Sequence, residues 1–150
     1  MPHEPYLILL YALAQRLSGV DSAAFVQAQC LVIDGKRLDF LLERDSFDAA
    51  EDRLIVRCEV RRLPEAASEA VCRLLLQADN LWAGTRGATL GLLGDDVVLL
   101  SESARIASLD GPGLVALVAG LHRQAKAWGD ELDRATRPEV TNVLPLHARA

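Results

Sequence analysis

Three cysteines and three histidines are the side chains in this 150-residue chain that could act as nucleophiles or hold a metal ion. A cysteine nucleophile needs a neighbouring base and an activating environment, and a zinc site needs cysteines or histidines at ligand spacing. The sequence offers neither, because no two cysteines form a CxxC pair and the histidines stand alone. We expect no metal site and no cofactor at Cys30, Cys58, Cys72, His3, His122 and His147. We place His122 on the solvent side of a helix, and we interpret Cys30 and Cys58 as small apolar residues on the apolar faces of strands.

Two further groupings resemble catalytic or phosphate-binding patterns. The acidic residues Asp39, Glu43, Asp45 and Asp48 could form a carboxylate pair for acid–base catalysis. Two of them alternate outward on a predicted strand and the others lie in a polar turn, so we expect a solvated surface. The stretch Gly84-Thr85-Arg86-Gly87 is glycine-rich, but it follows a helix and precedes a strand, which is the reverse of a phosphate-binding loop. The sequence therefore predicts no enzymatic activity.

The charge and hydropathy of the chain exclude several classes of partner. A net charge of −5 and a pI near 5.2 disfavour nucleic acid, which is bound by clustered lysine and arginine. The first apolar segment, residues 6–14, is shorter than the ~20 residues of a membrane span. Ala12-Leu13-Ala14 resembles a signal-peptide cleavage site, but no lysine or arginine precedes it. We expect a cytoplasmic protein without membrane insertion, and the odd number of cysteines is consistent with a reducing compartment.

The N-terminal half is predicted to form one helix and three antiparallel strands. The helix is expected to end at Gly19, and alternating residues predict strands over 25–33, 37–43 and 53–61. Asp34-Gly35 is typical of a tight hairpin turn, and a polar connector from Asp45 to Asp52 joins the second strand to the third. The residues expected to face inward are Val26, Ala28, Cys30, Val32, Leu38, Phe40, Leu42, Leu54, Val56, Cys58 and Val60.

The C-terminal half is predicted to add two helices and two short strands. A helix is expected over residues 64–83, because proline is tolerated at a first helical position. Strands over 88–92 and 97–101 follow, joined by a turn at 94–96. Asp110 or Ser108 can cap a last helix, whose apolar stripe is Leu114, Val118, Leu121, Ala125, Trp128 and Leu132. The predicted fold is a single α+β domain over residues 1–134, with the order α-β-β-β-α-β-β-α, an antiparallel sheet and a flexible tail at 135–150.

The stretch from Leu74 to Leu92 joins the end of the second helix to the next strand. Gly84 is predicted to be the left-handed residue that ends the helix. The run QADNLWAGTRGATLGL resembles the signature of the class I type III secretion chaperones, the Tir-chaperone or CesT-like family. With the flanking pattern, the resemblance covers about residues 4–132. Two features depart from the family: Arg86 stands where a small residue or glycine is common, and the first helix is unusually apolar.

The resemblance implies a fold and a function. The family has the same order of elements and consists of small, acidic, cytosolic homodimers without enzymatic activity or cofactor. Such a protein binds an extended N-terminal segment of a secreted effector, keeps it soluble, and delivers it to the export apparatus, whose ATPase is a further partner to consider.

Two alternatives remain open at this point. A small hot-dog acyl thioesterase is also a dimer of this size, but it would place one long helix early in a sheet of five or more longer strands. A dimeric α+β ligand-binding or regulatory module has the same overall shape.

The apolar helices and strands predict two binding surfaces. The residues expected to bind the effector, beside outward charges that keep a sheet edge soluble, are Leu7, Ile8, Leu10, Tyr11, Ala14, Leu38, Phe40 and Leu42. The residues expected at a two-fold dimer interface are Val71, Leu74, Leu75, Ala78, Trp82 and Leu90. The outward charges are Arg37, Asp39, Glu43, Arg57, Glu59 and Arg61.

Overall fold

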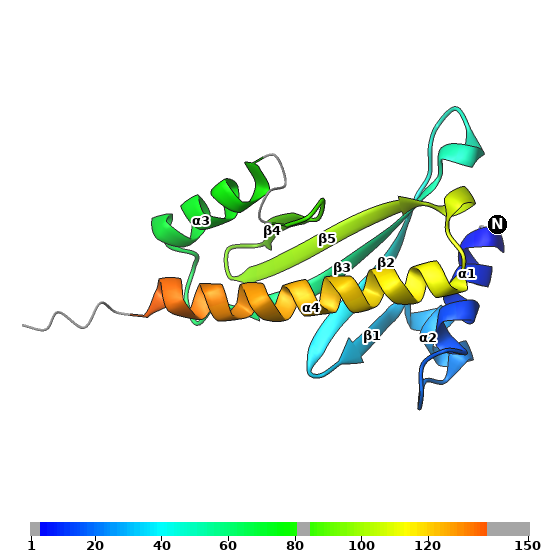
Figure 1. Cartoon of the computed structure of the whole chain (residues 1–150), viewed down its shortest axis with the longest axis horizontal. Helices are drawn as coiled ribbons and strands as arrows, with labels where there is room; N and C mark the ends of the chain where they lie inside the picture. The colour runs from blue at the N-terminus through cyan, green and yellow to red at the C-terminus, as the bar shows by residue number, and fades with distance from the viewer. Residues whose placement is uncertain (1–3, 81–84, 138–150) are drawn as a thin grey trace, which may run out of the picture.

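The fold is a five-stranded antiparallel sheet with helices packed against one of its faces (Figure 1). The computed structural model describes residues 4–80 and 85–137. The strands lie side by side in the order β1-β2-β3-β5-β4, so β1 and β4 are the edge strands. The elements are α1 (Glu4–Ala14), α2 (Ser22–Ala28), β1 (Cys30–Ile33), β2 (Lys36–Glu43), η1 (Ala49–Glu51), β3 (Arg53–Arg62), α3 (Glu69–Asp79), β4 (Thr89–Leu93), β5 (Val97–Arg105), η3 (Ile106–Ser108) and α4 (Gly111–Thr136).

The core is built on the alternation of β2 and β3. Leu54, Val56, Cys58 and Val60 are at most 1% exposed, while the residues between them are half-buried. The hairpin between β1 and β2 turns at Asp34-Gly35, both with positive φ, as predicted. Because one face of β3 is apolar and the other polar, the inward set predicted for β2 and β3 is confirmed.

The long helix α4 covers the apolar face of the sheet and contacts β3 and β5. Asp110 caps it by accepting a hydrogen bond of 2.8 Å from the backbone N–H of Gly113. The predicted stripe is buried except at Trp128, which is half-buried, while Gly129 is buried. Arg61 lies over Gly129 and pairs with Asp133 at 2.9 Å. The prediction that Arg61 points outward is therefore wrong, because a bulge between residues 59 and 61 shifts the register of β3.

The first predicted strand is half helix, which corrects the expected element order. Asp21 caps α2 through the N–H of Ala24 at 2.9 Å, and Gln29, with φ of 53°, ends it. Phe25 is buried and packs edge-on against Phe40, with ring centroids 5.2 Å apart. The capped turn and this contact outweigh the alternating pattern, so the strand begins only at residue 30.

The face assigned to the first strand is also reversed. Leu31 is the buried residue of β1, whereas Val32 is 69% exposed. Cys30 is half-buried and lies opposite Asp39 on the other face of the sheet from Cys58. A one-residue shift in a strand exchanges its two faces, and the helical turn before β1 produced that shift.

The other boundaries differ at their ends. The first helix stops at residue 14, before the turn that contains Gly19. The second helix begins at residue 69 because Ser68 caps it through the N–H of Val71 at 3.3 Å. Residues 63–67 instead bond to the hairpin turn after β4, with the N–H of Leu63 donating to the carbonyl of Asp96 at 2.7 Å. The predicted helix end at Gly84, the residue Trp82 and residues 138–150 lie outside the described residues.

Candidate partner-binding surfaces

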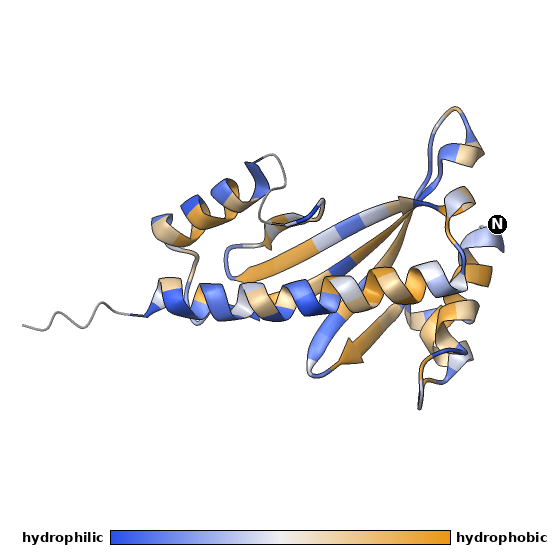
Figure 2. Cartoon of the chain, viewed as in Figure 1, coloured by the Kyte–Doolittle hydropathy of each residue, from blue (hydrophilic) through white to orange (hydrophobic). Residues whose placement is uncertain are grey.

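Helix α1 is apolar on two sides, and only one of them is covered. Leu10 and Leu13 are fully buried, and the helix contacts α2 and α4. The hydroxyl of Tyr6 donates to the side-chain oxygen of Gln29 at 3.0 Å, and burial raises the pKa of this phenol to about 12. On the other side, Ile8 is 58% and Tyr11 is 44% exposed. These two residues, one helical turn apart, are the α1 surface. In Figure 2 most of α1 has the colours of hydrophobic residues.

The predicted effector-binding residues divide between the core and the surface. Ile8 and Tyr11 are exposed and Leu7 and Leu42 are half-buried. The other four are at most 2% exposed, so in this conformation they support the surface and offer a partner no contact: Leu10, Ala14, Leu38 and Phe40. The sequence prediction missed Val32, which is exposed on the edge strand β1. An apolar residue close to the Asp34-Gly35 turn could have indicated an exposed position, but the sequence analysis had assigned Val32 to the inward face.

Further exposed apolar side chains lie on α3 and β4, at the other end of the sheet from α1 (Figure 1). Leu76 is 74%, Leu93 54% and Leu92 37% exposed, and we call these three the α3–β4 surface. The two elements are in contact, and the carboxylate of Asp79 accepts a hydrogen bond of 2.8 Å from the N–H of Leu90. This bond fixes the strand edge against the helix.

Four of the predicted dimer-interface residues are used inside the protomer instead. They are at most 6% exposed, because their side of α3 packs on β4 and α4: Val71, Leu75, Ala78 and Leu90. Leu74 is half-buried and remains reachable, whereas Trp82 lies outside the described residues. The periodicity located the apolar stripe of α3 correctly but could not show which side the protomer itself covers.

Two neighbouring recesses lie beside Leu74, where α3 approaches the C-terminal part of α4. One has a volume of about 590 Å³ and the other about 410 Å³. The accessible surface of both recesses is mainly apolar, although charged side chains contribute to their walls. The remaining lining residues are Glu69, Ala70, Arg73, Gln77 and Ala135 in the first, and Ala127, Trp128, Asp130, Glu131 and Arg134 in the second. Both recesses are wide open to solvent, so they suit contact with a protein surface better than enclosure of a small ligand.

The residues considered above as candidates for catalysis or metal binding have structural environments. Burial raises the pKa of the Cys58 thiol to about 11, so it is protonated at neutral pH and is not an activated nucleophile. Asp39 pairs with Arg37 at 2.9 Å. His122 is not on the wet side as predicted, because its side chain is 16% exposed and its Nε2 lies 3.7 Å from a carboxylate oxygen of Asp34.

Within residues 4–80 and 85–137, no group of three or more histidine, cysteine or acidic side chains could hold a metal ion. In the same residues, no helix has the length and apolar character needed to cross a membrane. The glycine-rich turn behaves as a backbone turn: Arg86 and Gly87 both have positive φ, and the N–H of Ala88 donates to the carbonyl of Thr85 at 3.1 Å.

The sequence profile of the Tir chaperone protein (CesT) family matches residues 9–129. The chain belongs to this family. The resemblance read from the residues around Asn80 is thereby confirmed, and so are the α+β antiparallel fold and the function of a type III secretion chaperone. The thioesterase alternative is not supported, since the family is a chaperone family and the long helix is the last element, packed on one face of the sheet.

Chains of two solved complexes are similar to this chain. A chain of the ExsC–ExsE complex is 21% identical, with a TM-score of 0.69 over 85% of this chaperone and 92% of that chain. A chain of the heterodimeric ExoU–SpcU complex, from the type III secretion system of Pseudomonas aeruginosa, is 18% identical, with a TM-score of 0.48 over 84% and 95% of the two chains. The search of curated proteins finds no matching sequence.

Proposed function

We propose that this chaperone binds an extended N-terminal segment of a type III secretion effector in the cytoplasm, keeps it soluble, and delivers it to the export apparatus. The observation that carries the proposal is the exposure of Ile8 and Tyr11 on a helix whose opposite side is buried against the rest of the protein. An exposed apolar patch on a folded protein usually marks an interaction site. The family membership of the chain gives the class of partner.

The edge strand β1 supplies the second half of the proposed site. It lies at one end of the sheet order and contacts α2, which in turn contacts α1. An extended peptide can add to such an edge through main-chain hydrogen bonds, which demand little of its sequence. Val32 beside this edge and the α1 surface would then hold alternate apolar side chains of the segment.

The proposal includes a homodimer and no catalytic step. The α3–β4 surface lies at the end of the sheet away from α1 (Figure 1), so two protomers joined there leave both α1 surfaces free. Holding an unfolded segment needs neither ATP nor a catalytic residue. Failure of the purified protein to hydrolyse acyl-CoA would separate this function from that of a thioesterase.

The proposal is tested by substituting Ile8→Asp and measuring both melting and retention of the effector on co-expression. Because Ile8 is 58% exposed, the change should cost at most about 1 kcal/mol of stability. A charge in the binding surface should nevertheless abolish co-purification of the effector. The matched control is Ala116→Asp, an exposed position on α4, which should retain it. Normal effector yield with Ile8→Asp would show that the α1 surface is not the docking site.

A further inference from the structure

The loop between β2 and β3 carries the most exposed large apolar side chain among the described residues. Phe47 is 99% exposed, and its loop, residues 45–52, projects from the end of the sheet (Figure 1). We call it the Phe47 loop. Its backbone is ordered by its own aspartates: one carboxylate oxygen of Asp45 accepts from the N–H groups of Phe47 and Asp48, both at 2.9 Å. The ring is therefore held at the tip of a preformed turn.

The base of the loop is fastened to the rest of the protein. Asp52 is 2% exposed and accepts a hydrogen bond of 2.8 Å from the N–H of Asp45. Its carbonyl accepts from the N–H of Ile106 at 2.9 Å, and Glu51 pairs with Arg105 at 3.0 Å. A loop whose backbone is already ordered loses little backbone entropy on binding, which favours its use as an anchor.

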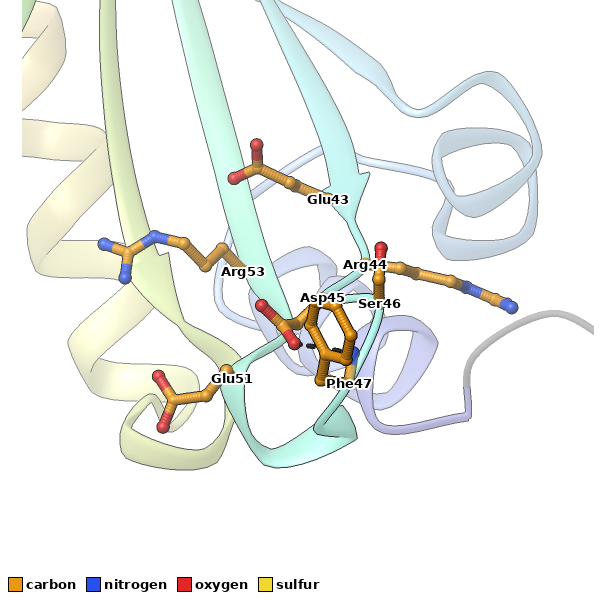
Figure 3. Close-up of a pocket in the computed structure, with 7 residues that line it drawn as sticks. All are labelled: Glu43, Arg44, Asp45, Ser46, Phe47, Glu51 and Arg53. Atoms are coloured by element: carbon orange, nitrogen blue, oxygen red, sulfur yellow. Dashed lines mark hydrogen bonds between the residues drawn. The ribbon is translucent and has the colours of Figure 1, made fainter.

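The surroundings of the ring are acidic. Residues 43–53 contain two arginines and five carboxylates, of which four are exposed and Asp52 is buried. Hydrogen bonds from the N–H groups of Phe47 and Asp48 lower the pKa of Asp45. A shallow recess of about 290 Å³ lies beside the ring. In Figure 3 the side chains of Arg44 and Arg53 extend away from Phe47 in opposite directions. An incoming surface thus meets an aromatic ring with carboxylates around it.

We infer that the Phe47 loop docks into an apolar pocket with a basic rim on a folded protein other than the effector. Part of this inference rests on the proposed function, because an effector held as an extended segment has no pocket to receive the ring. The basic rim follows from charge complementarity with the acidic loop. The loop lies next to Arg53 and Arg105, which are opposite each other on β3 and β5. Strand β4 pairs with the other end of β5, residues 97–101. Docking at the Phe47 loop therefore leaves the α3–β4 surface free.

The first experiment places the photo-crosslinking residue p-benzoylphenylalanine at position 47 or at position 8 in cells that express the effector. Position 47 should form an adduct with a folded protein that is neither the effector nor a second copy of this chain. Position 8 should form an adduct with the effector. If position 8 captures no effector, the proposed function fails, whereas the adduct at position 47 is judged separately.

The second experiment titrates the protein captured at position 47, after purification, with wild-type and variant chaperone. Phe47→Ala should weaken binding by at least about tenfold, and added salt should weaken the wild-type complex. Ser46→Ala, a change at the neighbouring exposed residue, should leave the affinity unchanged. Because the Phe47 side chain is almost fully exposed, the melting temperature of the Phe47→Ala variant should equal that of the wild type. An adduct with the effector or a second copy, no adduct, or equal affinity for Phe47→Ala would overturn the inference.

Discussion

Leu75 and Leu76 are neighbours on α3 with opposite environments, and substituting them separates the core from a dimer interface. Leu75 is 5% exposed and Leu76 is 74% exposed. In a monomer, Leu75→Ala should cost about 2–5 kcal/mol of unfolding free energy through loss of buried methyl groups. Leu76→Asp should cost at most about 1 kcal/mol, because little of the side chain is buried and aspartate is a weaker helix former than leucine.

The proposed two-fold dimer changes the second expectation but not the first. A two-fold interface uses the same patch on both subunits, so Leu76→Asp would enter the interface twice. Loss of a central interface side chain costs about 2 kcal/mol or more. Two copies therefore weaken the dimer by about 4 kcal/mol, which is roughly a thousandfold in dissociation constant.

Sedimentation equilibrium over a range of protein concentrations, combined with urea unfolding, measures both quantities. The expected result is that Leu76→Asp gives a folded monomer and Leu75→Ala gives a destabilised protein. Since dimerisation stabilises the fold by mass action, the melting temperature of the wild type should also rise with concentration. A wild type that is monomeric at micromolar concentration, or a Leu76→Asp variant that dimerises as tightly as the wild type, would refute the assignment of the α3–β4 surface.

Two further predictions concern groups inside the protomer. Burial raises the pKa of Glu102, so its stabilising contribution is present below its unfolded pKa and is lost as pH rises through the folded value. Glu102→Gln should therefore raise the melting temperature at pH 7 but not at pH 4. An equal gain at both pH values would contradict this cause. On α4, Gly120→Ala should stabilise by about 1 kcal/mol in urea unfolding, because the nearest side-chain atom to a Cβ there is 3.8 Å away. Gly129→Ala should gain less by about 0.2–1 kcal/mol, because its Cβ would lie 2.7 Å from Arg61 and disturb the pair with Asp133; equal gains at the two glycines would contradict that contact.

The strands of the sheet centre were predictable because their environment is asymmetric. In β3 one face meets α4 and the other meets solvent, so the sequence alternates and reveals both the element and its orientation. The same logic failed at residues 25–28, where a period of two also fits a short run of mixed residues. A cap at Asp21 and the contact of Phe25 with Phe40 decide that segment, and the second of these depends on the fold.

The binding surfaces were less predictable than the fold for a related reason. Apolar residues on several sides of α1 indicate that the helix has more apolar surface than the protomer can bury. Residue type alone does not show that Leu10 is buried and Ile8 is exposed. That difference depends on where α2 and α4 lie. The sequence analysis missed Leu76 because it lies beside the apolar stripe of α3. Only the packing of α3 on β4 shows that the stripe itself is buried within the protomer, whereas Leu76 is exposed.

The charged face of the sheet disfavours a partner that would cover it. Arg57 and Glu59 lie on the half-buried face of β3, opposite the face under α4, and Arg37 pairs with Asp39 on β2 nearby. Desolvating such charges under a partner would cost several kcal/mol per unpaired ion, so a face-to-face complex is disfavoured. The edge strands β1 and β4 instead carry exposed apolar side chains, with Val32 69% and Leu93 54% exposed. A partner that adds at an edge would gain backbone hydrogen bonds while the charged face stays in water, which favours the edges of the sheet over this face for such a complex.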